Sequence, residues 1–305
     1  MNDGVTISIF QLAQMFPDQD SACAYLEAQR WPEGAICPRC AGNDRIGTRK
    51  GGYYRCNACK VDFTVRTGTL MERSHIPLHK WLYTMYLLVT CRKGISSLQL
   101  SKQIGITQKS AWFLLHRLRE ACDNDLQMLR GVVQIDETFV GGKKKNKPLS
   151  KRTKLGRRSA DKQVVIGMRE VGGRTRAQLI DSVSIKNITS VVTKHVEPGS
   201  MLYTDELPAY QSLPPLYQHQ TVSHKELEYV RDEVTTNSIE SLWAVMKRGL
   251  HGVYHHASKK HLGRYANEFT FRLNAGNVKL HTLLRLNALA DACVGKRITY
   301  RELTI

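Results

Sequence analysis

The chain has few acidic residues and no long hydrophobic run. It counts 27 Asp and Glu against 45 Lys and Arg in 305 residues, a formal charge of +18. This imbalance favours a polyanionic partner, first nucleic acid and only secondarily an acidic membrane surface. The longest apolar stretch, 81–91, is too short to cross a bilayer, and the first residues lack the basic lead-in of a secretory signal. We therefore expect a cytoplasmic protein with no membrane partner.

Composition and length indicate a folded, multi-domain chain. Hydrophobic residues make up 42% of the sequence and aromatic residues 8%, which excludes disorder over the whole length. At about 100–200 residues per domain, the length predicts two or three domains.

The eight cysteines divide into one cluster and four single residues. Cys37 and Cys40 form a CxxC pair, and Cys56 and Cys59 form a second pair after 15 intervening residues. This spacing predicts one tetrahedral, structural Zn²⁺ whose four positions are all filled by thiolates. Disulfides or four ordinary buried thiols are the alternative, which fits poorly with the absence of an export signal. The remaining cysteines are expected in the core: Cys23, Cys91, Cys122 and Cys293.

Basic and aromatic side chains surround the predicted zinc site. They are Arg39, Arg45, Lys50, Tyr53, Tyr54, Arg55 and Lys60. Such a surface suits phosphate contacts and base stacking. A solvated ribbon surface, or a surface that binds another protein, would show the same pattern.

Residues 95–122 predict two short helices joined by a turn. Gly105 and Ile106 supply the turn, and Thr107 caps the second helix. The pattern is typical of a helix-turn-helix, with a plain helical hairpin as the alternative. The residues expected near a DNA-recognition face are Lys109, Ser110, Trp112 and His116.

Beyond residue 130 the pattern changes to strands and helices. Strands are predicted at 131–142, 163–171, 176–185, 201–206 and 219–224, and helices at 185–196 and 235–250. This order favours an α/β domain with a mixed sheet. The stretch 143–158 holds nine Lys and Arg and no acid, so we expect it to lie along phosphates; a solvated loop is the alternative.

Two isolated aspartates stand where predicted strands end. Asp136 follows an apolar run, and so does Asp205. A DNA-binding chain should keep acids away from phosphates unless these acids hold a metal ion. Each aspartate is followed by a glutamate, Glu137 or Glu206, which strand alternation directs to the opposite face.

A third acid lies in the predicted helix at 235–250. Glu240 shares a helical face with Asn237 and Lys247, three residues before it and seven after it. Asp136, Asp205 and Glu240 together could hold two Mg²⁺ or Mn²⁺ ions for an in-line phosphoryl displacement. Lys247 could then reach a DNA phosphate. Taken alone, a helical Glu is more often a plain surface residue.

At this point the sequence resembles the bacterial insertion-sequence DDE transposases of the Merlin-related group that carry an N-terminal zinc ribbon. The matching stretches are CPRC…CNAC, FTVRTGTLMERSHIPLHKW, QIDETFVGGK, YTDELPAY and NSIESLWAVMKRGLHGVYHHASKKHLGRYANEFTFRLN. The resemblance implies an RNase H-like catalytic core with Asp136, Asp205 and Glu240 as its triad. The 35-residue offset between Asp205 and Glu240 fits the family, as does the spacing to Lys247. Asn237 is the alternative third ligand, because some relatives use Asn.

Four histidines follow this helix, at positions 251, 255, 256 and 261. A second metal site is one interpretation of this cluster. Contact with the DNA backbone or packing is the favoured one, since no Cys or acid accompanies the histidines at ligand spacing.

These patterns predict a multi-domain α/β protein with five segments. They are a helical lead-in at 1–30, a zinc ribbon at 31–66, a helix-turn-helix region at 75–123, an RNase H-like catalytic domain at 128–285 and a C-terminal tail at 286–305. The predicted function is a transposase that binds the terminal inverted repeats of its own element, cleaves DNA and joins the 3′-hydroxyl ends to target DNA. We expect at least a dimer on DNA. The alternatives are a non-catalytic DNA-binding regulator and a structure-specific RNase H-like nuclease.

Overall fold

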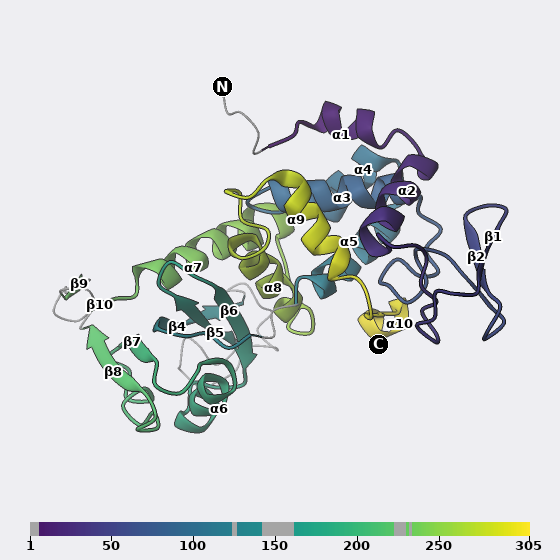
Figure 1. Cartoon of the computed structure of the whole chain (residues 1–305). Coiled ribbons are helices and arrows are strands. Elements are labelled where there is room, and N and C mark those ends of the chain that lie inside the picture. The colour runs from purple at the N-terminus through teal and green to yellow at the C-terminus, as the bar shows by residue number, and fades with distance from the viewer. Residues whose placement is uncertain (1–5, 124–126, 142–161, 223–229, 232–233) are drawn as a thin grey trace. The chain divides into compact units, whose positions relative to one another are not determined.

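The computed structural model describes residues 6–123, 127–141, 162–222, 230–231 and 234–305. The chain divides into two units (Figure 1). The first comprises Met1–Asn124 and Ala275–Ile305, and the second comprises Asp125–Asn274. The division differs from the predicted segments at the C-terminal end, because residues 275–285 group with the first unit and not with the predicted catalytic domain. In the described residues, no helix is long and apolar enough to span a membrane.

The ribbon of the first unit is a three-stranded antiparallel sheet in the order β1-β2-β3. Its strands are β1 (Ile46–Arg49), β2 (Tyr53–Cys56) and β3 (Val61–Phe63). Gly51 and Gly52 both have positive φ in the turn between β1 and β2, a conformation that favours glycine. Tyr54 stacks on Phe63, with ring centroids 5.5 Å apart, and Trp31 meets both rings edge-on.

Helices make up the rest of the first unit. They are α1 (Ile9–Met15), α2 (Gln19–Arg30), α3 (Leu78–Thr90), α4 (Ser97–Ile104), α5 (Gln108–Ala121), α9 (Thr282–Asp291) and α10 (Tyr300–Thr304). The side chain of Thr107 caps α5, and Gly105 ends α4 in the left-handed conformation. The C-terminal segment joins this core, because the guanidinium of Arg285 in α9 donates to the carbonyl of Val89 at 2.7 Å.

The second unit is built on a five-stranded mixed sheet in the order β6-β5-β4-β7-β8. Its strands are β4 (Val132–Val140), β5 (Gln163–Glu170), β6 (Thr175–Ile180), β7 (Met201–Asp205) and β8 (Gln218–Val222). The first three strands in the chain pair antiparallel, β7 runs parallel to β4, and β8 runs parallel to β7. A short pair, β9 (Val230–Arg231) and β10 (Val234–Thr235), lies outside this sheet. The predicted mixed sheet is confirmed, and its RNase H-like character stays a prediction.

Helices cover both faces of this sheet (Figure 1). On one face, α6 (Ile185–His195) packs Ile188 and Val192 against the odd-numbered side chains of β4. On the other, α7 (Asn237–Gly249) and α8 (Leu262–Leu273) pack a second apolar cluster that includes Trp243 and Phe269. A π-helical turn, η4 (Leu250–Tyr254), extends α7. Each face of the sheet is therefore backed by its own hydrophobic core.

Candidate active site

Two hydrogen bonds fix α7 on the central strand of the sheet. The backbone N–H of Ile239 donates to the side-chain oxygen of Gln134 at 3.2 Å, and the indole N–H of Trp243 donates to Oδ2 of Asp136 at 2.8 Å. Gln134 and Asp136 are two residues apart on β4, so both point to the face that α7 covers. The first predicted catalytic acid thus lies under the predicted catalytic helix.

Asp205 ends the strand next to Asp136. In the parallel pairing of β4 and β7, Gln134 is the partner of Tyr203, and each aspartate stands two residues further along its strand. Strand alternation therefore directs both aspartates to the same face. The backbone N–H of Leu207 donates to Oδ1 of Asp205 at 3.1 Å and orients the carboxylate at the end of the strand.

Glu137 lies on the opposite face, as strand alternation predicted. The hydroxyl of Tyr210, which is fully buried, donates to Oε2 of Glu137 at 2.7 Å. Sequence reasoning gave this glutamate no role. Yet its charge acts on Asp136, and the charge of Asp205 acts on Glu137. Adjacency to Asp136 was the only sequence signal for it, since Tyr210 is 73 residues away along the chain.

Neighbouring carboxylates disfavour the charged forms of Asp136 and Glu137. Burial raises the pKa of Asp136 to about 7, with further contributions from the charges of Glu137 and Asp205, although the bond from Trp243 opposes the shift. Burial also raises the pKa of Glu137. A bound cation would offset this repulsion between carboxylates, and hard carboxylate oxygens are the ligands that Mg²⁺ or Mn²⁺ prefers. The donor set therefore fits a divalent metal.

Glu240 stands in the first turn of α7, on the same face of the sheet as Asp136. It lies one residue after Ile239 and three before Trp243, the two residues that bond to β4. The hydroxyl of Thr236 donates to Oε1 of Glu240 at 3.0 Å. The structure thus places the helical acid on the side of the sheet that the predicted triad requires. Among the described residues, however, the four ribbon cysteines are the only group of three or more His, Cys, Asp or Glu side chains whose ligand atoms all lie within 4.8 Å of one another. Asp136, Asp205 and Glu240 do not form such a group.

The other predicted residues of α7 are exposed. Asn237 is the first residue of the helix, and its backbone N–H donates to the hydroxyl of Thr235 at 3.1 Å. Lys247 lies in the last turn beside Arg248, and both side chains are exposed. This end of α7 therefore presents two cations to solvent.

The four ribbon cysteines meet as predicted. Sγ of Cys37 lies 3.5 Å from Sγ of Cys59, Sγ of Cys40 lies 3.6 Å from Sγ of Cys56, and all four sulfurs lie within 4.8 Å of one another. A Zn–S bond of about 2.3 Å implies sulfurs about 3.8 Å apart in a regular tetrahedron. The predicted meeting of the four sulfurs is thus observed, and the cluster fits one fully coordinated Zn²⁺.

Comparison with known families gives the same division of the chain. Residues 128–274 match the ISXO2-like transposase domain, and residues 17–61 match the transposase zinc-ribbon domain; together these matches cover more than half of the chain. The chain carries an ISXO2-like transposase domain and a transposase zinc-ribbon domain. The predicted zinc-ribbon transposase family is confirmed, whereas the closer grouping with Merlin-related elements stays a prediction.

A relative comes from a transposable element of Halobacterium salinarum. It is an uncharacterized protein in element ISH50, 28% identical over 274 residues, and the match covers 84% of this chain and 91% of the relative. Solved structures give weaker matches. A chain of a pre-cleavage Mos1 transpososome is 12% identical with a TM-score of 0.28, covering 70% of this chain and 79% of that one.

A chain of a simian T-cell lymphotropic virus intasome, solved with a PP2A regulatory subunit, is 14% identical with a TM-score of 0.27. That match covers 61% of this transposase-family chain and about 65% of the intasome chain. At these scores neither structure supports an argument about this protein.

Two residues predicted to contact DNA, Tyr54 and His116, pack against other residues of the first unit. Tyr54 packs against Trp31 and Phe63, and its hydroxyl donates to Oε2 of Glu27 at 3.0 Å. His116 is fully buried and packs against the ring of Trp112. In the ribbon, Tyr53 is the aromatic residue that remains available, at 51% exposure.

Two further predictions concern basic surfaces. The run of nine cations between 143 and 158 lies outside the described residues. Of the histidines that follow α7, those at 251, 255 and 256 are exposed, which is compatible with backbone contacts. The two helices and the turn predicted for 95–122 are observed, but their assignment as a helix-turn-helix and their role in binding DNA stay predictions.

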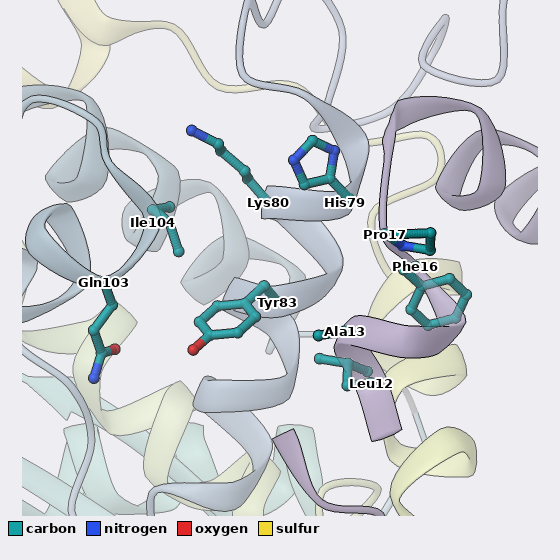
Figure 2. Close-up of a pocket in the computed structure, with 9 residues that line it drawn as sticks. All are labelled: Leu12, Ala13, Phe16, Pro17, His79, Lys80, Tyr83, Gln103 and Ile104. Carbon is teal, nitrogen blue, oxygen red and sulfur yellow. The ribbon is translucent and has the colours of Figure 1, made fainter. Parts of the chain in front are cut away.

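A pocket in the first unit contains none of the predicted catalytic acids (Figure 2). It has a volume of about 270 Å³ between α1, α3 and α4. The lining residues are Leu12, Ala13, Phe16, Pro17, His79, Lys80, Tyr83, Gln103 and Ile104. Since none of them is acidic, this pocket has no carboxylate that could bind a divalent metal ion.

Proposed function

We propose that this transposase-family chain is an active DNA transposase. It binds the terminal inverted repeats of its own element, cleaves a strand at each end by metal-dependent hydrolysis and joins the 3′-hydroxyl ends to target DNA. The observation that carries the proposal is the position of Asp136 beside Asp205 and beneath α7, the helix that contributes Glu240. A cytoplasmic location is part of the proposal.

In this proposal, Asp136, Asp205 and Glu240 hold two Mg²⁺ or Mn²⁺ ions. When bound, these ions activate the attacking oxygen and stabilise the departing one. Trp243 orients the carboxylate of Asp136, Leu207 orients that of Asp205, and Thr236 orients that of Glu240. Lys247 neutralises a DNA phosphate beside the scissile bond.

Both chemical steps are displacements at phosphorus. In the first, the oxygen of water attacks the scissile phosphate, and the 3′-oxygen leaves as a hydroxyl. In the second, that 3′-hydroxyl attacks a target phosphodiester and releases a 3′-hydroxyl on the target strand. The number of phosphodiester bonds is unchanged in the second step, so the joining step requires no energy-rich cofactor. Two ends must be held together, so the active species is at least a dimer on DNA.

A non-catalytic DNA-binding regulator is the second candidate. The zinc ribbon and the paired helices of the first unit favour it, because both occur in proteins that bind DNA without cutting it. It gives no reason for buried carboxylates in the middle of β4, Asp136 and Glu137, next to Asp205 at the end of β7.

A cleavage assay separates these functions. The protein is incubated with Mg²⁺ and a duplex that carries the ends of its element, beside an unrelated duplex of equal length. We expect nicks at the ends only, lost in Asp136→Asn, which retains end binding. End binding without any nick would favour the regulator, and equal cutting of both duplexes without joining would favour a structure-specific nuclease.

A further inference from the structure

A small cationic pocket lies within the first unit. Its volume is about 190 Å³, and three segments line it: the chain just after the ribbon, helix α5 and the stretch before α10. Arg73, Arg117 and Arg297 come from these segments, one from each, and Glu72 is the single acid in the lining. The pocket thus gathers three guanidinium groups from distant parts of the sequence.

Arg117 is the buried cation of this pocket. Its side chain is only 9% exposed, and its guanidinium carbon lies 4.2 Å from the ring centroid of Phe113. Its Nε is buried with no hydrogen-bond partner, whereas the acid of the pocket pairs with another cation: Oε1 of Glu72 lies 3.9 Å from Nε of Arg73. A buried positive charge with no anionic partner costs folding free energy, which a bound anion would offset.

The neighbouring charges increase this imbalance. Burial lowers the pKa of Arg117, and the charge of Arg297 lowers it further, while Glu72 opposes the shift. Glu72 is partly engaged elsewhere, because its Oε2 accepts a bond from the backbone N–H of Gly68 at 2.8 Å. One acid therefore faces three cations across the pocket.

We infer that this pocket binds a phosphate group between Arg117 and Arg297. A guanidinium offers paired donors that match the oxygens of phosphate, and an anion would satisfy the buried Arg117. At about 30 Å³ per water molecule, the volume corresponds to roughly six waters, which leaves room for a phosphate and part of its hydration shell. The phosphate comes from the DNA backbone or from a free phosphate ion. The DNA source rests on the proposed function, since α5 is the second helix of the predicted helix-turn-helix.

A salt series tests the DNA source. The affinity of the full chain for a labelled duplex is measured by fluorescence anisotropy at increasing salt. The slope of log K against log salt is negative, and each lost phosphate contact should reduce its magnitude by about one. We expect this loss, with roughly tenfold weaker binding, in Arg297→Gln. Arg297→Lys, which keeps the charge, should lose less, and Arg117→Lys should behave like Arg297→Gln because the paired donors are gone.

Arg301→Gln is the matched control, because Arg301 is exposed in α10 and lies outside the pocket. Its slope should equal that of the wild type. In a second arm, inorganic phosphate is titrated into the wild type and Arg297→Gln by calorimetry. Phosphate binding that Arg297→Gln abolishes, with an unchanged DNA slope, would assign the site to free phosphate.

Equal slopes for Arg297→Gln and Arg301→Gln together with no phosphate binding would overturn the inference. Its failure is distinct from failure of the proposed function. If the wild type nicks DNA, but Arg297→Gln leaves the salt slope unchanged and no phosphate binds, only the pocket proposal is rejected. If Arg297→Gln changes the salt slope but the wild type does not nick DNA, only the proposed transposase chemistry is rejected.

Discussion

Asp136 owes its orientation to one indole. Trp243 donates to its Oδ2 and is 4% exposed, so the bond is shielded from water. Asp136 and Trp243 are 107 residues apart, so the sequence alone could place each on its element but could not pair them. The same holds for Glu137 and Tyr210. The sequence did predict local features: Asp205 ends its strand, and Glu240 and Lys247 lie on one helix. The expected strand end at Asp136 was wrong, because β4 continues to Val140 through its pairing with β5.

Replacement of Trp243 by Phe should slow cleavage without unfolding the chain. The ring still fills its site, but Asp136 loses its donor, and a hydrogen bond to a charged group is worth about 1.5–3 kcal/mol. We expect nicking at saturating Mg²⁺ to slow by about tenfold, with Tm nearly unchanged. An unchanged rate would show that this bond does not position the carboxylate.

Glu170 provides a prediction on pH. Burial would raise its pKa, but the backbone N–H of Arg174, the guanidinium of Arg174 and the backbone N–H of Arg130 together lower it from 4.5. Because the folded pKa is lowered, this stabilisation is present above about pH 4.5 and is lost as the pH falls through the folded pKa.

Glu170→Gln should therefore unfold more easily than the wild type at pH 7, by about 1–2 kcal/mol. The difference should shrink on acidification below pH 4.5, the ordinary pKa of the group. Calorimetric Tm values across this range check the prediction. A difference that stays constant with pH would contradict it.

At the scale of elements, the position of α7 depends on a glycine beneath it. A Cβ on Gly167 of β5 would lie 2.5 Å from Cζ2 of Trp243 and 2.8 Å from Cδ1 of Ile239. Arg169, two residues further along β5, donates to the carbonyl of Ser238 at 2.8 Å and holds the start of the helix. The helix that bears Glu240 thus packs tightly against β5 and is hydrogen-bonded to β4.

Gly167→Ala should displace α7 from the sheet. We expect a loss of about 1–3 kcal/mol in unfolding free energy, as for other overpacked cores. Nicking should fall further than this stability loss explains, because Trp243 and Glu240 move together. Gly252→Ala is the control, since its Cβ would meet nothing within 4 Å. Equal losses of unfolding free energy and of nicking in the two variants would argue against tight packing of α7 on β5.

The sequence predicted most strands and helices of the second unit. The expected strands at 131–142 and 201–206 are observed as β4 and β7, and the expected helix at 235–250 as α7. These predictions rest on apolar runs and helix caps, which are local signals. Helices α8, α9 and α10 were not predicted, and neither was the burial of Tyr54 and His116. Their surroundings are assembled from distant segments, so local periodicity did not reveal them.

At the scale of the whole molecule, the metal-binding ribbon and the acid-bearing sheet belong to different units. The four cysteines hold together a ribbon whose own apolar core is small, so the Zn²⁺ contributes much of its folding free energy. The acids need the mixed sheet and its helices. The two metal functions should therefore be separable.

Zinc removal should disrupt the ribbon and spare the sheet. Cys56→Ser or a strong chelator is expected to abolish one bound Zn²⁺ per chain and weaken end binding by at least tenfold, because the ribbon loses its fold. Metal analysis and DNA titration measure both effects. Asp136→Asn should keep its zinc. Full zinc content in Cys56→Ser would contradict the assignment of the four ligands.

The most direct test of the account is to locate the catalytic metal. Crystals of the protein bound to its end DNA would be soaked in Mn²⁺, and an anomalous difference map would be calculated. We expect density between the carboxylates of Asp136, Asp205 and Glu240, and its loss in Asp136→Asn. Manganese bound elsewhere, or Glu240 turned away from an ion held by the two aspartates, would contradict it.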